Sequence, residues 1–129
     1  MSLWGAALLV AAGSACGGMA RHAVSSLVGR LAAGFPWGTL AVNVSGSFLI
    51  GILAAWGAQA QWFAAQPHVW LLAGVGFLGS YTTVSSFSLQ TLELLHARRF
   101  AHTAGNLLLS LGLCLAAVTA GAALMGAWS

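Results

Sequence analysis

Four long, mostly apolar stretches dominate this sequence and determine what the chain can fold into. They cover residues 3–20, 36–57, 69–95 and 102–128. A helix that crosses the hydrocarbon core of a bilayer needs about 20 such residues. Only 4% of the 129 residues are charged, so the chain lacks the polar surface of a water-soluble domain. We therefore expect one domain, residues 1–129, that is an all-α multi-pass protein of the cell inner membrane with four transmembrane helices.

The few charged residues lie at the ends of these stretches. The connections are residues 22–35, 58–68 and 97–101, and Glu93 is the only acid. All the cations lie at or within the first and third connections: Arg21, Arg30, Arg98 and Arg99. By the positive-inside rule, these two connections are predicted to face the cytoplasm. One acid and four histidines at helix ends provide no nucleophile, base and orienting group, so we expect no enzyme.

Two of the apolar stretches carry polar residues at helical spacing. The second stretch has Thr39, Asn43 and Ser47, and the fourth has Thr103, Asn106, Ser110 and Cys114. Residues spaced by three or four positions share one face of a helix. Polar groups in a membrane either form hydrogen bonds between helices or mark a functional path. Both interpretations remain open for Asn43.

The third stretch contains a segment that is unfavourable for a continuous helix. Residues 79–88 read GSYTTVSSFS, and glycine, β-branched threonine and serine all weaken helices. Non-helical backbone at membrane depth needs a covering of protein or a water-filled cavity. We therefore expect a broken third helix, with a continuous Ser/Thr-rich helix as the alternative. Two polar faces and a broken helix predict a narrow path for a small solute, and the Gly13-x-x-x-Gly17 spacing favours close helix packing.

Two longer motifs together resemble the CrcB/Fluc family of fluoride channels. Residues 35–47 read FPWGTLAVNVSGS, and residues 76–88 read GFLGSYTTVSSFS. Gly17, Gly18 and Arg21 also match the end of the family's first span. The resemblance extends over essentially the whole chain, and the two motifs in combination are specific.

The resemblance implies an antiparallel, dual-topology dimer with two narrow fluoride pores and a central structural sodium ion. The sodium is expected on the backbone carbonyls of Gly79 and Thr82. Fluoride requires hydrogen-bond donors that replace its water, and a phenyl edge can also face an anion. The residues expected along the fluoride path are Arg21, Thr39, Asn43, Ser47, Thr83, Val84, Ser85, Phe87, Asn106 and Ser110.

Three positions depart from the family pattern. Val84 stands where the family usually has phenylalanine, Asn106 where a tyrosine is common, and Gln90 where an acid is frequent. The leading hypothesis is passive fluoride export by a homodimer. Alternatives are one partner of a heterodimer, or a subunit that does not conduct. A third alternative, a small multidrug-resistance-type exporter, would need a carboxylate in the first span, which this chain lacks.

Overall fold

The protein is built from helices that run roughly antiparallel. The computed structural model describes residues 1–59, 61 and 65–127, and this part of the chain contains no strand. The elements are α1 (Leu3–Leu31), α2 (Trp37–Gln59), α4 (Pro67–Val69), the π-helix η1 (Trp70–Leu78), α5 (Gly79–Tyr81), α6 (Val84–His96) and α7 (Phe100–Gly126). Three of them, α1, α2 and α7, are long and apolar enough to cross a membrane. The chain is therefore an all-α, multi-pass membrane protein.

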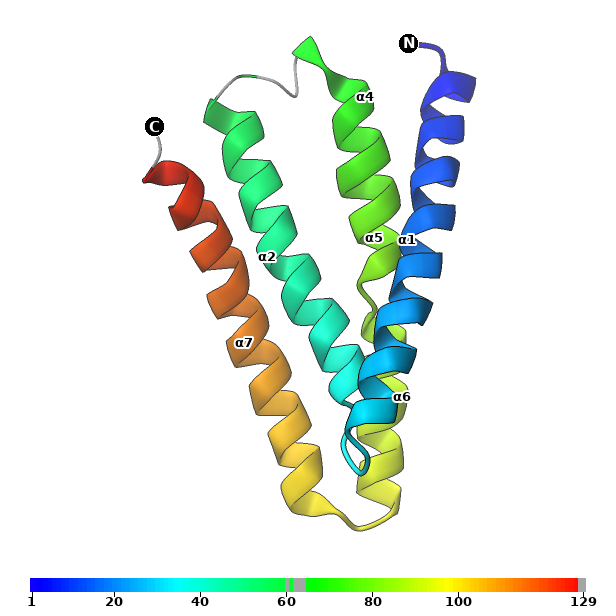
Figure 1. The fold of residues 1–129 in the computed structure, drawn as a ribbon, viewed down its shortest axis with the longest axis vertical. Helices are drawn as coiled ribbons and strands as arrows, with labels where there is room; N and C mark the ends of the chain where they lie inside the picture. Colours follow the sequence, from blue (N-terminus) through cyan, green and yellow to red (C-terminus); the bar gives the residue numbers. More distant parts are fainter. Residues whose placement is uncertain (60, 62–64, 128–129) are drawn as a thin grey trace.

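Residues 67–96, which include the predicted third span at residues 69–95, form several consecutive pieces. Pro67 begins α4, where a missing N–H is harmless, and α4, η1 and α5 follow each other directly. Thr82 and Thr83 then have extended backbone, with φ of −82° and −152°, before α6 begins at Val84. The two extended residues separate α5 from α6, as the ribbon between these labels shows in Figure 1.

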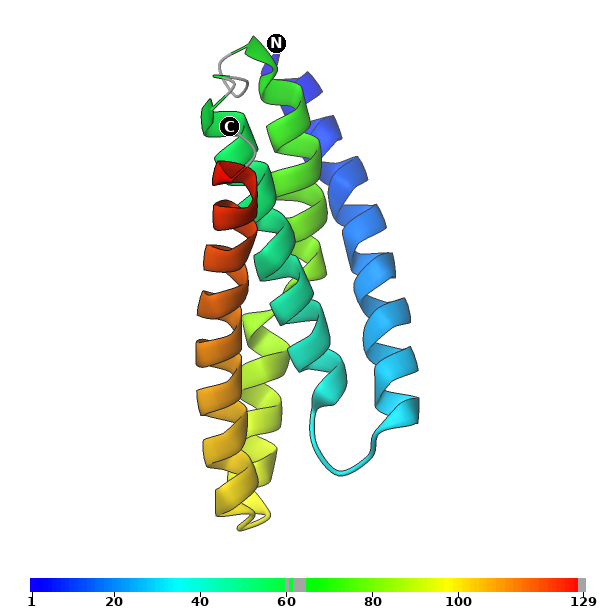
Figure 2. The ribbon, with the colours of Figure 1, turned by 60° about the vertical axis from the view of Figure 1, so that its left-hand side comes forward.

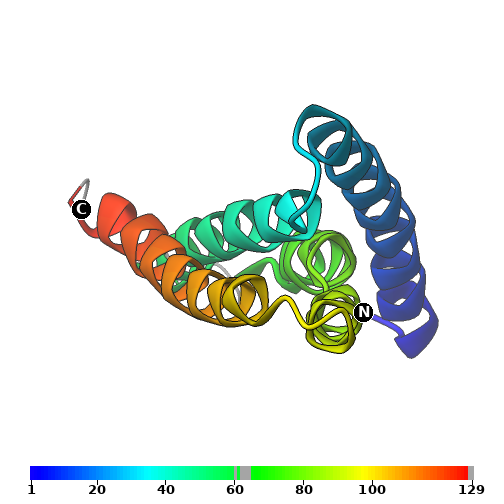
Figure 3. The same ribbon diagram turned by 90° about the horizontal axis from the view of Figure 1, so that it is seen from below.

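The helices form two groups that diverge toward one end. α2 packs along α7, while α1 packs along η1 and α5. α6 continues below α5 and contacts α7, which is clearest in the turned view of Figure 2. Seen from below, α1 and α7 flank the remaining helices (Figure 3). The first and last described residues lie at the same end, and the α1–α2 and α6–α7 connections lie at the other (Figure 1).

The first helix is longer than the sequence suggested. We predicted a connection over residues 22–35, and this prediction is wrong for residues 22–31, which belong to α1. No proline interrupts this segment, and the Ser25 hydroxyl bonds back to the Arg21 carbonyl at 2.6 Å within the helix. The chain turns only around Gly34, whose φ of 90° suits glycine. Arg30 consequently lies in the last turn of α1, where positive charge is favourable.

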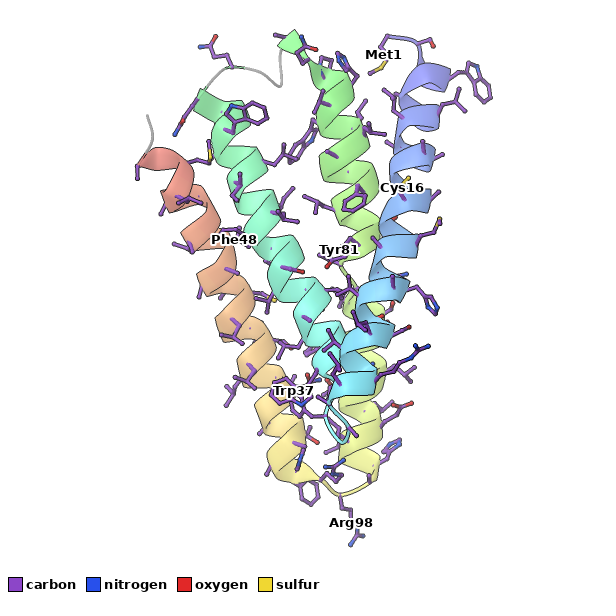
Figure 4. All side chains as sticks on the ribbon, viewed as in Figure 1. Met1, Cys16, Trp37, Phe48, Tyr81 and Arg98 are labelled. Atoms are coloured by element: carbon purple, nitrogen blue, oxygen red, sulfur yellow. The ribbon has the colours of Figure 1, made fainter. Side chains whose placement is uncertain are left out.

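Glycines allow the helix backbones to approach each other closely. A Cβ on Gly13 or Gly17 of α1 would overlap the backbone of η1, and both glycines are buried. A Cβ on Gly121 of α7 would overlap the Phe48 carbonyl oxygen of α2. Phe48 lies between these two helices in Figure 4. Because lipid provides no hydrophobic drive between helices, such close packing is a main source of stability in a membrane bundle.

This packing predicts different effects for two glycines of the same helix. Gly121→Ala should destabilise the protein by about 1–3 kcal/mol, because the added methyl group must push α2 and α7 apart. Gly112 faces open space on α7, so Gly112→Ala should change stability by less than about 1 kcal/mol. Thermal unfolding in detergent, followed by tryptophan fluorescence, measures both. Equal shifts in the two variants would contradict this account of the packing.

Candidate functional site

The side chain of Asn43 holds the extended residues between α5 and α6. Its Nδ2 donates to the Thr83 carbonyl oxygen at 2.9 Å, and the Thr83 N–H donates to Asn43 Oδ1 at 2.7 Å. A carboxamide offers the same donor and acceptor as a peptide group, so it satisfies the backbone that leaves the helix. The second N–H of the Asn43 amide has no partner among the described residues. The interhelical hydrogen bond anticipated as one interpretation of Asn43 is therefore formed, with one donor left over.

The break changes the bonding of the preceding carbonyl groups. In a continuous helix the Thr83 N–H would bond the Gly79 carbonyl, but here it bonds Asn43. Among the described residues no hydrogen bond reaches the carbonyl oxygens of Gly79, Ser80 or Tyr81. The Thr82 carbonyl accepts one long hydrogen bond, 3.5 Å, from Arg21 Nη1. The end of α5 therefore presents backbone oxygens that have no, or only weak, partners.

A cavity of about 610 Å³ lies beside the break and extends along α2 and α7. Eight residues that the sequence predicted as pore or sodium ligands line it: Asn43, Ser47, Gly79, Thr82, Thr83, Val84, Phe87 and Ser110. Most of the remaining lining is aliphatic, and no charged side chain contributes to it. The cavity is thus apolar with a few convergent polar groups, which is typical of small-ligand sites.

A second cavity, of about 250 Å³, lies on the other side of Thr83. Arg21 and His22 of α1, Thr39 of α2 and Ser86 of α6 line it, and Thr83 borders both cavities. Thr39 is 7% exposed, and its hydroxyl has no hydrogen-bond partner among the described residues. The residues predicted for one path are therefore divided between an uncharged cavity and a smaller one that holds the Arg21 guanidinium.

Two predicted path residues lie outside both cavities. The exposed Ser85 places its hydroxyl 3.1 Å from that of Thr83. Asn106 is 2% exposed, and its Nδ2 donates to Thr91 Oγ1 at 2.9 Å. Asn106 therefore connects α7 to α6. Gln90, also on α6, has a buried Oε1 without a partner in the described part of the chain.

Sequence reasoning missed two side chains that fix the site. Thr91 is the partner of Asn106, and the Tyr81 hydroxyl lies 2.9 Å from Ser45 Oγ. Tyr81 also stacks on Phe77, with the ring centroids 5.9 Å apart. Its position between α2 and α5 is visible in Figure 4. Each pair joins residues far apart in the sequence or on different helices, and spacing within one helix gives no signal for such pairs.

The double hydrogen bond predicts that Asn43 is needed for stability. Asn43→Ala leaves the N–H and C=O of Thr83 unpaired, at a cost of about 2 kcal/mol or more. Ser47→Ala is a matched control, because Ser47 lies one turn further along α2 in the same cavity and forms no hydrogen bond with the described residues. Thermal unfolding and hydrogen exchange at Thr83 measure the difference. Unchanged exchange at Thr83 in Asn43→Ala would contradict the assignment.

Comparison with known proteins gives a consistent result across the chain. Residues 8–122 match the family model described as CrcB-like protein, Camphor Resistance (CrcB). A protein of Bradyrhizobium diazoefficiens named fluoride-specific ion channel FluC 2 is 50% identical over 115 residues, covering 88% of this chain and 84% of the relative. The protein of the same name from Rhodopseudomonas palustris is 50% identical over 115 residues, covering 88% of each chain. A fluoride-specific ion channel FluC of Rhizobium meliloti is 44% identical over 121 residues, covering 93% of this chain and 95% of the relative.

Proposed function

The chain belongs to the CrcB-like family, and on this basis we propose that it is a fluoride-specific ion channel that lets fluoride leave the cytoplasm passively. The observation that carries the proposal is the 50% identity to relatives with that name over nearly nine tenths of the chain. These relatives are named ion channels, not enzymes. Passive export suits fluoride, because hydrofluoric acid enters uncharged, ionises inside, and the membrane potential then drives the anion outward.

The larger cavity supplies chemistry that suits a small, strongly hydrated anion. The remaining Asn43 N–H and the hydroxyls of Ser47, Thr83 and Ser110 are hydrogen-bond donors that can replace water around fluoride. The ring of Phe87 lines the same cavity, and its edge carries partial positive charge. No full charge lies in this lining, so each contact is weak enough for the ion to leave again.

The smaller cavity supplies longer-range attraction at one end of the path. Arg21 places its guanidinium there, and Thr39 offers a hydroxyl without a partner among the described residues. A cation at the mouth of a narrow site raises the local concentration of anions. Thr83 borders both cavities. We propose that fluoride passes from the Arg21 side to the Phe87 side past the hydroxyl of Thr83.

We propose that a second copy in antiparallel orientation completes the pore. Val84 is 77% exposed on the single chain, although it lies at the break within a membrane segment and lines the larger cavity. Homodimers are the commonest assemblies of such small units. One observation favours a heterodimer instead: all four arginines lie toward one end, which favours a fixed orientation. Accessibility of tags at both chain ends, from both sides of the membrane, separates the two arrangements.

The backbone at the break also fits the structural sodium ion that the family implies. Sodium is a hard cation that binds oxygen ligands, as calcium and magnesium do. The Gly79 carbonyl has no hydrogen-bond partner among the described residues, and the Thr82 carbonyl has only the long contact with Arg21. We propose these two carbonyls as ligands. A bound cation would offset the lost helix hydrogen bonds and attract fluoride from a distance.

The proposed path is tested by fluoride efflux from liposomes that contain the purified chain. Wild type should release fluoride rapidly, measured with a fluoride electrode, while chloride is retained. Phe87→Leu should slow fluoride efflux about tenfold. Loss of the interaction between fluoride and the ring edge should raise the barrier to efflux by about 1.4 kcal/mol, and a barrier change of this size alters a rate about tenfold. Phe77→Leu is the matched control, since Phe77 stacks on Tyr81 and does not line the larger cavity.

Two results would contradict this path. Equal slowing of efflux by Phe77→Leu and Phe87→Leu would show that Phe87 acts through general packing only. Absence of fluoride efflux with a wild-type protein that is folded and dimeric would reject a homomeric fluoride channel. It would favour a channel that needs a second, different subunit.

The sodium proposal predicts that the protein is more stable in sodium than in a matched salt of N-methylglucamine. A ligand whose free concentration is about one hundred times its Kd stabilises the folded state by about 2.7 kcal/mol. The unfolding midpoint temperature should therefore rise with sodium concentration. Thermal unfolding in the two salts at equal ionic strength measures this. Identical midpoints at every concentration would exclude a structural sodium site.

A further inference from the structure

Three of the four arginines, together with two histidines, lie at the end that holds the α1–α2 and α6–α7 connections. We call the following exposed residues the basic surface: Arg30, His96, Arg98, Arg99 and His102. Arg98 lies at the extreme of this end in Figure 4. The opposite end has no arginine, lysine, aspartate or glutamate at all. The charge is therefore strongly segregated along the axis of the bundle.

Backbone contacts fix the shape of the basic surface. The Arg98 N–H bonds the Leu95 carbonyl and the Arg99 N–H bonds the Leu94 carbonyl, each at 3.0 Å, which closes the turn after α6. The Arg99 side chain reaches the α1–α2 connection, since a Cβ built on Gly34 would lie 3.8 Å from Arg99 Nη2. The turn after α6 therefore places the Arg99 side chain beside the α1–α2 connection.

The positive charge of this surface is not neutralised within the chain. Glu93, which is exposed on α6, is the only acid in the sequence and can offset at most one of the arginine charges. None of the basic-surface residues lines either cavity of the proposed ion path. The ion path therefore gives no reason for this concentration of exposed charge.

Exposed aromatic side chains place the basic surface at the membrane interface. Phe100 is 62% exposed and Trp37 is 40% exposed, and both lie at this end. The ring of Phe35 lies near two other rings at this end, with centroid distances of 4.7 Å to Trp37 and 6.2 Å to His102. Tryptophan is enriched at the depth of the lipid headgroups, so Trp37 supports an interfacial position for this end of the bundle.

We propose that the basic surface binds the headgroups of anionic phospholipids. The guanidinium fork of arginine matches the oxygens of a phosphate, and basic residues next to a membrane helix attract anionic lipids. The inference does not depend on which ion the protein conducts. It assigns a binding role to Arg98 and Arg99, and it gives the two ends of the bundle different lipid preferences.

The test measures the relative association of spin-labelled phosphatidylglycerol and phosphatidylcholine with the full-length protein in bilayers, by electron paramagnetic resonance. Wild type should prefer phosphatidylglycerol, and Arg98→Gln with Arg99→Gln should lower the preference about fivefold for each arginine removed. His68→Gln is the matched control, because His68 is exposed at the opposite end and its loss should have no effect. Arg98→Lys with Arg99→Lys keeps the charge and should retain most of the preference.

Four outcomes would overturn the proposal. The first is equal association of the two lipids with wild type. The second is an unchanged preference in a folded Arg98→Gln, Arg99→Gln variant. The third is measured on wild type alone and so stands even if the variant fails to fold: a preference that does not weaken between about 0.05 M and about 0.5 M salt would exclude an electrostatic surface. Loss of the preference in millimolar inorganic phosphate would assign the surface to soluble anions instead.

Discussion

The hydrogen bonds between Asn43 and Thr83 are the interaction on which the rest of the site depends. Two extended residues between α5 and α6 leave backbone groups without helix partners, and each such group is costly when it is buried. The Asn43 amide pairs with both polar groups of Thr83, at 2.9 Å and 2.7 Å. One side chain of α2 thereby stabilises a break in a different segment, frees the carbonyl oxygens of α5, and starts α6 with Thr83 as its N-cap.

The break also organises the electrostatics around it. Thr83 separates an uncharged cavity, which holds the hydroxyls and Phe87, from a smaller cavity that holds Arg21. In the proposed path, the smaller cavity attracts the anion and the larger, uncharged cavity lets it pass. This separation suits an ion that must bind and then be released. The other arginines lie in the last turn of α1 and in the turn between α6 and α7. The four arginines therefore fall into two groups: Arg21 lies at the smaller cavity, and the other three lie at the helix connections.

Much of this arrangement could be predicted from the sequence, because apolar length and polar spacing are local signals. The membrane-spanning character and the starts of α2 and α7 to within two residues followed from such signals, whereas the family was indicated by the resemblance of two motifs. The C-terminal end of α1 could not be predicted in this way. Its last turns contain polar residues but are still helical, and the chain turns only at Gly34. The pairing of Asn43 with Thr83 and of Asn106 with Thr91 depends on how separate helices pack, which spacing within one helix does not encode.

The central claim is that a fluoride-selective path runs beside the Asn43–Thr83 interaction. The reversal potential of the current through the purified protein in a planar bilayer tests it most directly, with fluoride on one side and chloride on the other. The account predicts a current carried by fluoride, with a reversal potential that follows the fluoride gradient and ignores chloride. A reversal potential that follows chloride, or one that follows the cation gradient, would contradict it.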